Sequence, residues 1–548
     1  MKALSLSRHQ STSTIKSAAT LQNRHHPRWN AVSIQKFGAA LVVLMGLSVS
    51  APPSYPQTPA PVRTPLGVFA HLSIEDALKR YKGSANPTED DLRAYLRNIY
   101  TGLLLDPAIS GITIGQHWDH IQPDDPSCVF TNSCTDGPGG YDWSYLDDAF
   151  AAANAAHKTV QLLITPGVDS PTWLMDKIPS CDGLFTGDYT APFNCGKVTF
   201  NNFPEQAHSD SPDPPLPLPW NPLYIAAWDD FLIHLSARYS GNPALTYIAM
   251  AGPMCGSTEI IFPTTLNKSI QLYGMPADQA WQILIQHSFP YFPGYQNSDQ
   301  VFIDAWKQTI DAYEWIFSGI TLVISPDSGD DLPEQPYPVH VHPDNFLYGV
   351  DCSTSDDLMS CEAKTEILSY FAEARGPNEK GSQVGGMTAG SNTSTGDIGI
   401  PGIKVLTSYM PPLHPPFLGG AEFDLQVSDP DNMQQQGCPD YSAKDPNPAD
   451  CVYLTPEQAA YNTFKVFFDG TPDATDFGGT PGSVPMQYVE VDYVDVQYAQ
   501  DPKNKCQTYL PSMTQGPPSL QDYYNLASYD LLTMAGKPAT LPATTCKP

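Results

Sequence analysis

The chain has 548 residues and a formal net charge of −30 at pH 7, with 58 acidic against 28 basic residues. So acidic a chain is expected to repel nucleic acid and anionic membranes, which excludes both as partners. Hydrophobic residues make up 41% of the chain, too many for a disordered protein and enough for a large core. The 55 prolines and 39 glycines predict long ordered loops on a rigid scaffold.

The first fifty residues carry only basic charges, and they include an apolar run at residues 37–47 followed by small residues at 48–50. This order predicts a secretory signal peptide over residues 1–50, hence a secreted or periplasmic protein without a membrane partner in its mature form. The alternative is an N-terminal membrane anchor, for which the apolar run is short. Residues 51–64 are Pro-rich and predict an extended, flexible linker, followed by one catalytic domain over residues 65–548.

Ten of the eleven cysteines fall into neighbouring pairs, and the first four pairs lie in stretches rich in Pro, Gly, Asp or Ser. In an exported chain such pairs predict local disulfides that staple loops. The expected pairs are Cys128 with Cys134, Cys181 with Cys195, Cys352 with Cys361, Cys438 with Cys451, and Cys506 with Cys546. Cys255 is left over, and no CxxC spacing indicates a cysteine zinc site.

Apolar runs of strand length alternate with helix-like stretches along the chain. Strands are expected at residues 66–72, 109–118, 158–168, 245–253, 320–329, 382–391, 417–427 and 485–499. Eight strands, each followed by a helix, predict an α/β protein and a (β/α)8 TIM barrel. The alternative, a doubly wound open sheet, usually has a Gly-rich turn after its first strand, and this chain has none there. The long, disulfide-stapled loops follow the strands and therefore fall on the C-terminal face, where such barrels have their active sites.

Three segments of the chain carry a family resemblance: ISGITIGQHWDHIQP, GGYDWSYLDDAFAAANAAHKTVQLLITPG and PLPWNPLYIAAWDDFLIHLSARYSGNPALTYIAMAGP. They resemble the second to fourth β/α units of glycoside hydrolase clan A, especially its β-galactosidase-like branch. The resemblance covers residues 66–260, and beyond them it depends on the strand count alone. It implies hydrolysis of β-glycosidic bonds in an oligo- or polysaccharide, with retention, by an acid/base at strand four and a nucleophile at strand seven.

The sequence departs from this family pattern at the end of strand four. The acid/base of the clan follows an asparagine directly, but here residues 251–253 read Ala-Gly-Pro. Glu259 is the nearest glutamate, and the Gly-Pro break would let the chain turn back over the barrel mouth. The apolar residues after Glu259 favour burial and a raised pKa. Glu259 is therefore the candidate acid/base, and the alternative is an ordinary loop carboxylate.

The nucleophile has two candidates. Glu422 lies in strand seven after two glycines, and Glu490 lies in strand eight. The retaining mechanism requires two carboxyl groups about 5–5.5 Å apart, one protonated and one ionised. A third interpretation makes these glutamates a buried polar layer of the barrel, paired with Lys or His.

Aromatic and polar residues near the ends of strands two and three are candidates for sugar binding. Indole rings stack on the C–H face of a pyranose, and polar groups bind its hydroxyls. Trp143 and Trp228 are instead expected to pack helices. The substrate-binding candidates are His117, Trp118, Asp169, Trp173 and Trp220.

No metal or cofactor is expected from the sequence. His340 and His342 alternate in VHVHPD without an evident third ligand, and DPDN is too short for a calcium loop. Other hydrolase classes lack support, because the chain has neither a Gly-x-Ser-x-Gly elbow nor an HExxH motif. The alternative to a glycosidase is a barrel of the same ancestry that has lost the acid/base and binds carbohydrate without cleaving it.

Overall fold

The computed structural model of the protein describes part of the chain. The described residues are 63, 65–135, 137–185, 195–200, 215–253, 271–272, 274–276, 280–281, 283–284, 300–317, 319–324, 367, 370, 386–390, 418–423, 486–502 and 519–542. The expected signal peptide and nearly all of the expected linker lie outside these ranges. None of the helices within them is long and apolar enough to cross a membrane.

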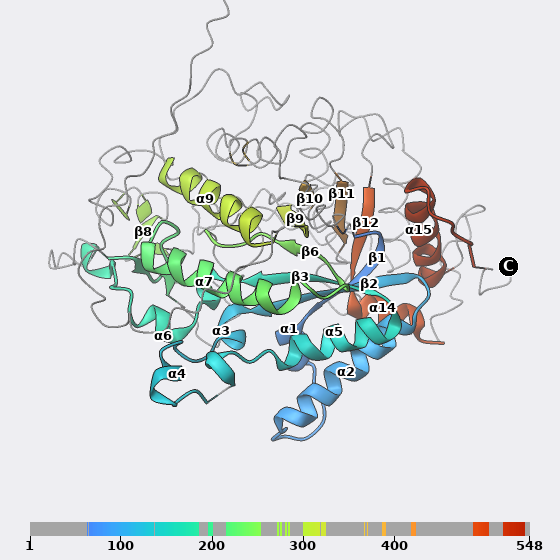
Figure 1. The fold of residues 1–548 in the computed structure, drawn as a ribbon, viewed down its shortest axis with the longest axis horizontal. Coiled ribbons are helices and arrows are strands. Elements are labelled where there is room, and N and C mark those ends of the chain that lie inside the picture. The colour runs from blue at the N-terminus through green and yellow to red at the C-terminus, as the bar shows by residue number, and fades with distance from the viewer. Residues whose placement is uncertain are drawn as a thin grey trace, which may run out of the picture. The chain divides into compact units, whose positions relative to one another are not determined.

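The central sheet consists of eight parallel strands whose pairings run β1-β12-β11-β10-β9-β6-β3-β2 and return from β2 to β1 (Figure 1). The strands are β1 (Gly67–Ser73), β2 (Ile109–His117), β3 (Thr159–Thr165), β6 (Leu245–Ala249), β9 (Thr321–Ile324), β10 (Gly386–Gly390), β11 (Leu418–Phe423) and β12 (Met486–Asp492). The α/β class and the parallel sheet expected from the sequence are therefore confirmed. Because the strands run in one direction, their carboxyl ends share one edge, where proteins of this class bind ligands.

Side chains alternate between the two faces of the strands, as the two-residue period of a strand requires. In β1, Val68 and Ala70 pack outward against the helices, whereas Phe69 faces the inside and meets the Tyr488 ring at 6.1 Å. Gly111 of β2 allows close approach, because a Cβ there would lie 2.6 Å from the Phe69 ring. The inner apolar cluster consists of Phe69, Leu163, Tyr247, Ala249, Val323 and Tyr488.

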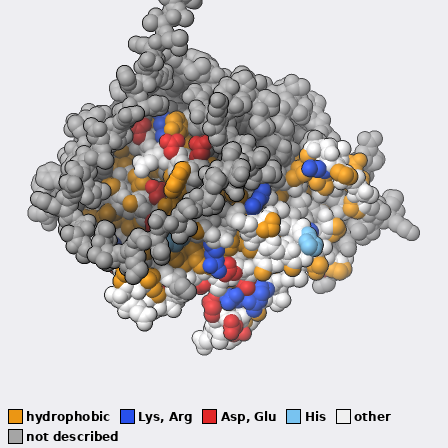
Figure 2. Space-filling model, viewed as in Figure 1, with side chains coloured by type: hydrophobic (Ala, Val, Ile, Leu, Met, Phe, Trp, Pro, Cys, Tyr) orange, Lys and Arg blue, Asp and Glu red, His pale blue; other side chains and the backbone are white. Residues whose placement is uncertain are grey.

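The longer helices are α1 (Ile74–Lys79), α2 (Glu89–Leu105), α5 (Ser144–Ala156), α7 (Pro222–Tyr239), α9 (Gln300–Ile316), α14 (Tyr493–Gln500) and α15 (Leu520–Met534). α7 begins as its sequence predicts, since Asn221 caps it and Pro222 occupies its first position. α2 and α5 lie side by side, and Arg93 bonds to Asp148 between them at 2.8 Å (Figure 1). Figure 2 shows charged side chains of both signs gathered over these two helices.

The loops contain several short helices and strands. They are α3 (Trp118–Ile121), α4 (Cys128–Thr131), η1 (Pro138–Gly140), η2 (Gly167–Asp169), α6 (Thr172–Met175), η3 (Asp182–Leu184), β4 (Lys197–Val198), β5 (Leu216–Pro217), β7 (Gln271–Leu272) and β8 (Met275–Pro276). The disulfides Cys128–Cys134 and Cys181–Cys195 are present in loops after β2 and β3, as expected. The other three expected pairs, from Cys352 to Cys546, lie outside the described residues.

The eighth strand is shorter than the sequence predicts. β12 ends at Asp492, and α14 begins at Tyr493, whereas a strand is expected to continue to residue 499. Asp492 stops the strand by capping the helix, since its carboxylate accepts the backbone N–H of Val494 at 2.6 Å. Strands two and three also end early, at His117 and Thr165, where α3 and η2 take over.

Arg63, near the end of the expected flexible linker, is held in place. Its guanidinium donates to the backbone oxygens of Asn242, Ser240 and Leu245, and its own carbonyl accepts from the Thr321 hydroxyl at 2.6 Å. These contacts join the segment before β1 to the start of β6 and β9. Arg63 itself is therefore anchored to the sheet, and the rest of the expected linker stays a prediction.

Candidate functional site

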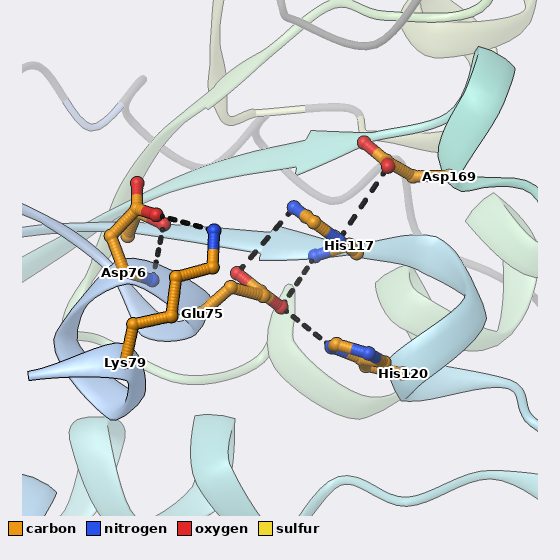
Figure 3. Close-up of polar contacts among 7 residues, drawn as sticks. Glu75, Asp76, Lys79, His117, His120 and Asp169 are labelled. Carbon is orange, nitrogen blue, oxygen red and sulfur yellow. Dashed lines mark hydrogen bonds and ion pairs between the residues drawn. The ribbon is translucent and has the colours of Figure 1, made fainter. Parts of the chain in front are cut away.

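A cluster of ionisable side chains lies at the carboxyl ends of β1, β2 and β3 (Figure 3). Glu75 stands in the first turn of α1, directly after β1. His117 is the last residue of β2, and His120 follows in α3. Asp169 ends η2, just beyond β3. Because parallel strands end at one edge of the sheet, residues far apart in the sequence meet here.

Glu75 is the centre of this cluster. One carboxylate oxygen, Oε1, accepts the backbone N–H of His117 at 3.0 Å and lies 2.9 Å from Nδ1 of His120. The other oxygen, Oε2, lies 3.9 Å from Nε2 of His117 and has no hydrogen-bond partner among the described residues. Burial opposes ionisation of Glu75, but the hydrogen bond from His120 and the nearby His117 hold its pKa below the ordinary value.

His117 lies between two buried carboxyl groups. Its Nδ1 is 3.5 Å from Oδ1 of Asp169, while its Nε2 faces Glu75 on the other side (Figure 3). The rings of His117 and His120 stack with their centroids 5.3 Å apart. The side chain of His120 is 54% exposed, so the cluster reaches solvent on that side.

Two further carboxyl groups in this region resist ionisation. Asp169 is 1% exposed, and its burial together with the negative charge of Asp119 raises its pKa well above the ordinary value. Burial raises the pKa of Asp119 to about 6, and the charge of Glu75 adds to this shift. Within the described residues no Lys or Arg forms an ion pair with Glu75, Asp119 or Asp169. The arrangement gathers three carboxyl groups where burial makes their ionisation costly.

Three residues of the cluster have the donor types of a metal site. One ligand atom each from Glu75, His117 and His120 can be chosen so that all three lie within 4.8 Å of one another. The sequence predicted His117 and Asp169 as substrate-binding residues, which stays a prediction, and it did not single out Glu75, Asp119 or His120. The available signal was the His-x-x-His spacing at residues 117–120, directly after a strand.

A second polar group lies on the face of the sheet that carries Phe69, Tyr247 and Tyr488. Glu490 of β12 is 1% exposed, and the hydroxyl of Tyr247 from β6 donates a hydrogen bond to its carboxylate. Glu422 of β11 is in register with Glu490, so the two candidate nucleophiles occupy paired positions on adjacent strands. The choice between these two rival nucleophiles stays a prediction.

The end of β6, where the family pattern has its acid/base, is closed by aromatic side chains. The Ala251 carbonyl accepts from the Trp228 indole at 2.8 Å, and the Ala251 N–H donates to the Tyr313 hydroxyl at 3.1 Å. Gly252 has a φ of +154°, and a Cβ there would lie 3.2 Å from Thr309, so both the backbone and the space favour glycine. Glu259 and Cys255 lie outside the described residues, and the role of Glu259 stays a prediction.

The aromatic candidates lie in different surroundings. Trp118 is fully buried, its ring 4.9 Å from that of Trp228, and so it presents no face to a sugar. Trp220 is also buried and packs against Trp281. Trp173 is half-buried, with Lys177 over its ring at 4.8 Å, and it is the one of these three candidates with accessible surface to offer. Trp228 is buried in helix packing, as the sequence predicts, and Trp143 packs partly buried against the same core.

No protein-family model matches the chain, and no curated protein matches it. Among solved structures, endo-glycoceramidase II from Rhodococcus sp. is 12% identical, with a TM-score of 0.25 over 60% of this chain and 68% of that one. A β-galactosidase from the psychrophilic Marinomonas ef1 is 10% identical, with a TM-score of 0.32 over 78% and 54% of the two chains. The AHE enzyme from Alicyclobacillus herbarius is 10% identical, with a TM-score of 0.35 over 79% and 89%. The first two are glycoside hydrolases, but at this distance the chemistry of the site must be argued from its own residues.

Proposed function

We propose that the chain is a secreted (β/α)8 barrel that hydrolyses β-glycosidic bonds in an oligo- or polysaccharide by a retaining mechanism. The closed order of strand pairings supports the barrel, as do the described helices that follow β1, β2, β3, β6 and β12. The two loop disulfides, Cys128–Cys134 and Cys181–Cys195, are consistent with export.

The observation that carries the proposal is the buried Glu490 carboxylate and its contact with Tyr247. A phenol O–H that donates to a carboxylate stabilises its negative charge and fixes its direction. A nucleophile that attacks an anomeric carbon must be ionised and aligned in this way. Glu490 is therefore the proposed nucleophile, with Glu422 at the paired position of β11 as its rival.

The second carboxyl group must donate a proton to the leaving oxygen. Glu259 is proposed for this role, because it follows β6, the strand that also supplies Tyr247. In the first step the nucleophile bonds to the anomeric carbon as the glycosidic oxygen leaves with the proton of the acid. In the second step water releases the sugar, and the former acid takes up the proton of that water.

The proposal is tested with aryl β-glycosides of several sugars and the substitutions Glu490→Gln, Glu422→Gln and Glu259→Gln. Glu490→Gln is expected to lower kcat/KM at least about a thousandfold, as the loss of a nucleophile does. Added azide should restore turnover in Glu490→Gln with a glycosyl azide of inverted configuration, because azide then displaces the aryl group directly, whereas azide rescue of Glu259→Gln should give a glycosyl azide of retained configuration. Glu89→Gln, a change of the same kind on the exposed start of α2, is the control. Azide rescue of Glu422→Gln instead would move the nucleophile to β11, and full activity in all three variants would refute the proposal.

A second candidate function is carbohydrate binding without cleavage. The end of β6 favours it, since residues 251–253 offer no carboxyl group and are held by Trp228 and Tyr313. This candidate predicts that the wild-type protein binds oligosaccharides in calorimetry but turns over none of the glycosides. Measurable turnover that Glu259→Gln abolishes would exclude it.

A further inference from the structure

We propose that Glu75, His117 and His120 bind one divalent transition-metal ion of the zinc class at the carboxyl ends of β1 and β2. This inference does not rest on the proposed glycosidase function, because it makes no use of Glu490, Tyr247 or Glu259, although His117 is also a substrate-binding candidate. The sequence predicts no metal site, and the donors come together only in the fold.

The first argument is convergence. Glu75 comes from the start of α1, whereas the two histidines come from the end of β2 and from α3, so two β/α units supply the donors. One atom from each residue lies within 4.8 Å of the other two. Two histidines and one carboxylate are a common zinc ligand set, with water in the remaining position. Hard cations such as calcium prefer oxygen ligands alone, so imidazole favours zinc or its neighbours.

The second argument is the gap between Glu75 and His117. Oε2 of Glu75 is buried, lacks a hydrogen-bond partner in the described part of the chain, and lies 3.9 Å from Nε2 of His117. That distance is too long for a hydrogen bond. Two ligands of one tetrahedral zinc ion, each about 2.1 Å from the metal, lie roughly 3.4 Å apart. A shift of about half an ångström would therefore let one ion bridge these two atoms.

The third argument is the position of Asp169. The Asp169 side chain is almost completely buried beside that of Thr165, and its Oδ1 points at Nδ1 of His117 from 3.5 Å (Figure 3). Metal-binding histidines almost always donate their second ring N–H to a carboxylate or carbonyl, which fixes the tautomer. With a proton on Nδ1 facing Asp169, the lone pair of Nε2 faces the Glu75 carboxylate. Two acceptors that face each other in a buried site are stabilised by a cation between them.

The fourth argument is charge. Glu75, Asp119 and Asp169 are gathered beside the two imidazoles, and within the described ranges no lysine or arginine pairs with any of the three. A dication bound by Glu75 and the imidazoles would lie beside these carboxyl oxygens and be attracted to them. The exposed side of His120 provides an entry path and room for bound water. Asp169 is then a positioning residue and not a ligand.

The test uses the full chain, stripped with EDTA, dialysed and titrated with Zn²⁺ alone by calorimetry and against a chromophoric chelator. Wild-type protein is expected to bind one ion per chain at this site. His120→Gln is the first variant, because its half-exposed side chain can be changed without disturbing the core, and it should weaken binding at least about a hundredfold. Asp169→Asn keeps the ligands and should weaken binding about tenfold.

The matched control is His157→Asn. His157 is exposed at the end of α5 with a φ of +55°, a conformation that asparagine tolerates, so the variant loses one imidazole and keeps its fold. Zinc affinity in this control should equal that of the wild type. Glu75→Gln, checked for native circular dichroism, should behave as His120→Gln does. Absence of wild-type binding below millimolar zinc would overturn the proposal, and so would wild-type affinity in both His120→Gln and Glu75→Gln. Neither result would alter the aryl-glycoside assays, so the two proposals fail separately.

Discussion

Two neighbouring ends of the sheet are built in opposite ways. At the ends of β1, β2 and β3, buried ionisable groups face one another, and several of their oxygens accept no hydrogen bond from the described residues. At the end of β6, the N–H and carbonyl of Ala251 and the carbonyl of Gly252 all form hydrogen bonds with aromatic side chains. These side chains also fill the space around the backbone. Burial of the ionisable groups at the first end lowers the free energy of unfolding, whereas the aromatic packing at the end of β6 raises it.

This difference separates residues that serve packing from residues that serve a ligand. Natural sequences break the rules of burial mainly at functional sites, because selection for folding alone would remove unpaired buried charge. Asp169 is a buried carboxyl group, which folding alone disfavours, whereas Trp228 is a buried aromatic ring whose N–H has a hydrogen-bond partner. Substitutions at the two ends should therefore change the free energy of unfolding in opposite directions.

The largest effect is expected for Trp228→Ala. The indole is almost fully buried, contacts the rings of Trp118 and Phe231, and donates to the Ala251 carbonyl. Its removal leaves a cavity and an unpaired carbonyl, and should lower the free energy of unfolding by about 3–5 kcal/mol in urea titrations.

Trp315→Ala is the control, because that tryptophan lies 76% exposed on α9 and its loss should cost less than about 0.5 kcal/mol. An equally small loss for Trp228→Ala would show that the end of β6 relaxes around the missing ring. The contrast between the two ends would then disappear.

The packing of the sheet is what the sequence predicts well. Apolar runs that alternate with helix-like stretches predicted the strands, since burial on both faces leaves a continuous apolar signal. The end of β12 was missed because Val489, Val491 and Tyr493 continue an alternating pattern into a helix. The side chain of Asp492, which caps the helix, marks the boundary between β12 and α14. In the sequence an aspartate at this position is as compatible with the end of a strand as with a helix cap, so the boundary could not be predicted.

The second prediction concerns Asp169 and pH. Its pKa is raised in the folded protein, so folding favours the protonated carboxyl. Stability is therefore unaffected below the unfolded pKa of about 3.9, falls as the pH rises from there to the folded pKa, and stays lowered above it. Asp169→Asn removes this cost. In EDTA, at pH 7, it should raise the free energy of unfolding by about 1–3 kcal/mol, the usual cost of an unsatisfied buried group.

Urea titrations of wild type and Asp169→Asn between pH 4 and pH 8 measure this difference, which should vanish at the acid end. Asp230→Asn, on the exposed side of α7, is the control and should follow the wild type within about 0.5 kcal/mol. A loss of stability in Asp169→Asn at pH 7 would mean that the ionised carboxylate holds the fold together. The polar cluster would then be structural, like the end of β6.

The polar cluster was only half visible in the sequence, for a geometric reason. His117 and Asp169 were identified because polar residues at strand ends are conspicuous, but Glu75 lies 42 residues before His117 and belongs to another β/α unit. Its partners are fixed by the register between β1 and β2, which no local pattern encodes. Glu490 and Tyr247, 243 residues apart, illustrate the same limit across the sheet.

The smallest effect is expected at the cap of α7, the helix that presents Trp228 to the end of β6. The Asn221 side chain accepts the backbone N–H groups of Leu223 and Tyr224 at 3.0 and 3.1 Å. Asn221→Ala should lower the free energy of unfolding by about 1 kcal/mol, and Asn221→Gly by only a few tenths, since glycine lets water solvate the freed groups. Zinc affinity should not change in either variant, because α7 supplies no ligand.

The contrary outcome is a loss of unfolding free energy in Asn221→Ala as large as that in Trp228→Ala. The cap would then position the Trp228 ring, and the stability of the end of β6 would depend on the geometry of α7. A loss near 1 kcal/mol would mean that the buried aromatic contacts supply the stability of the end of β6. Those contacts distinguish this end from the cluster of ionisable side chains beside it.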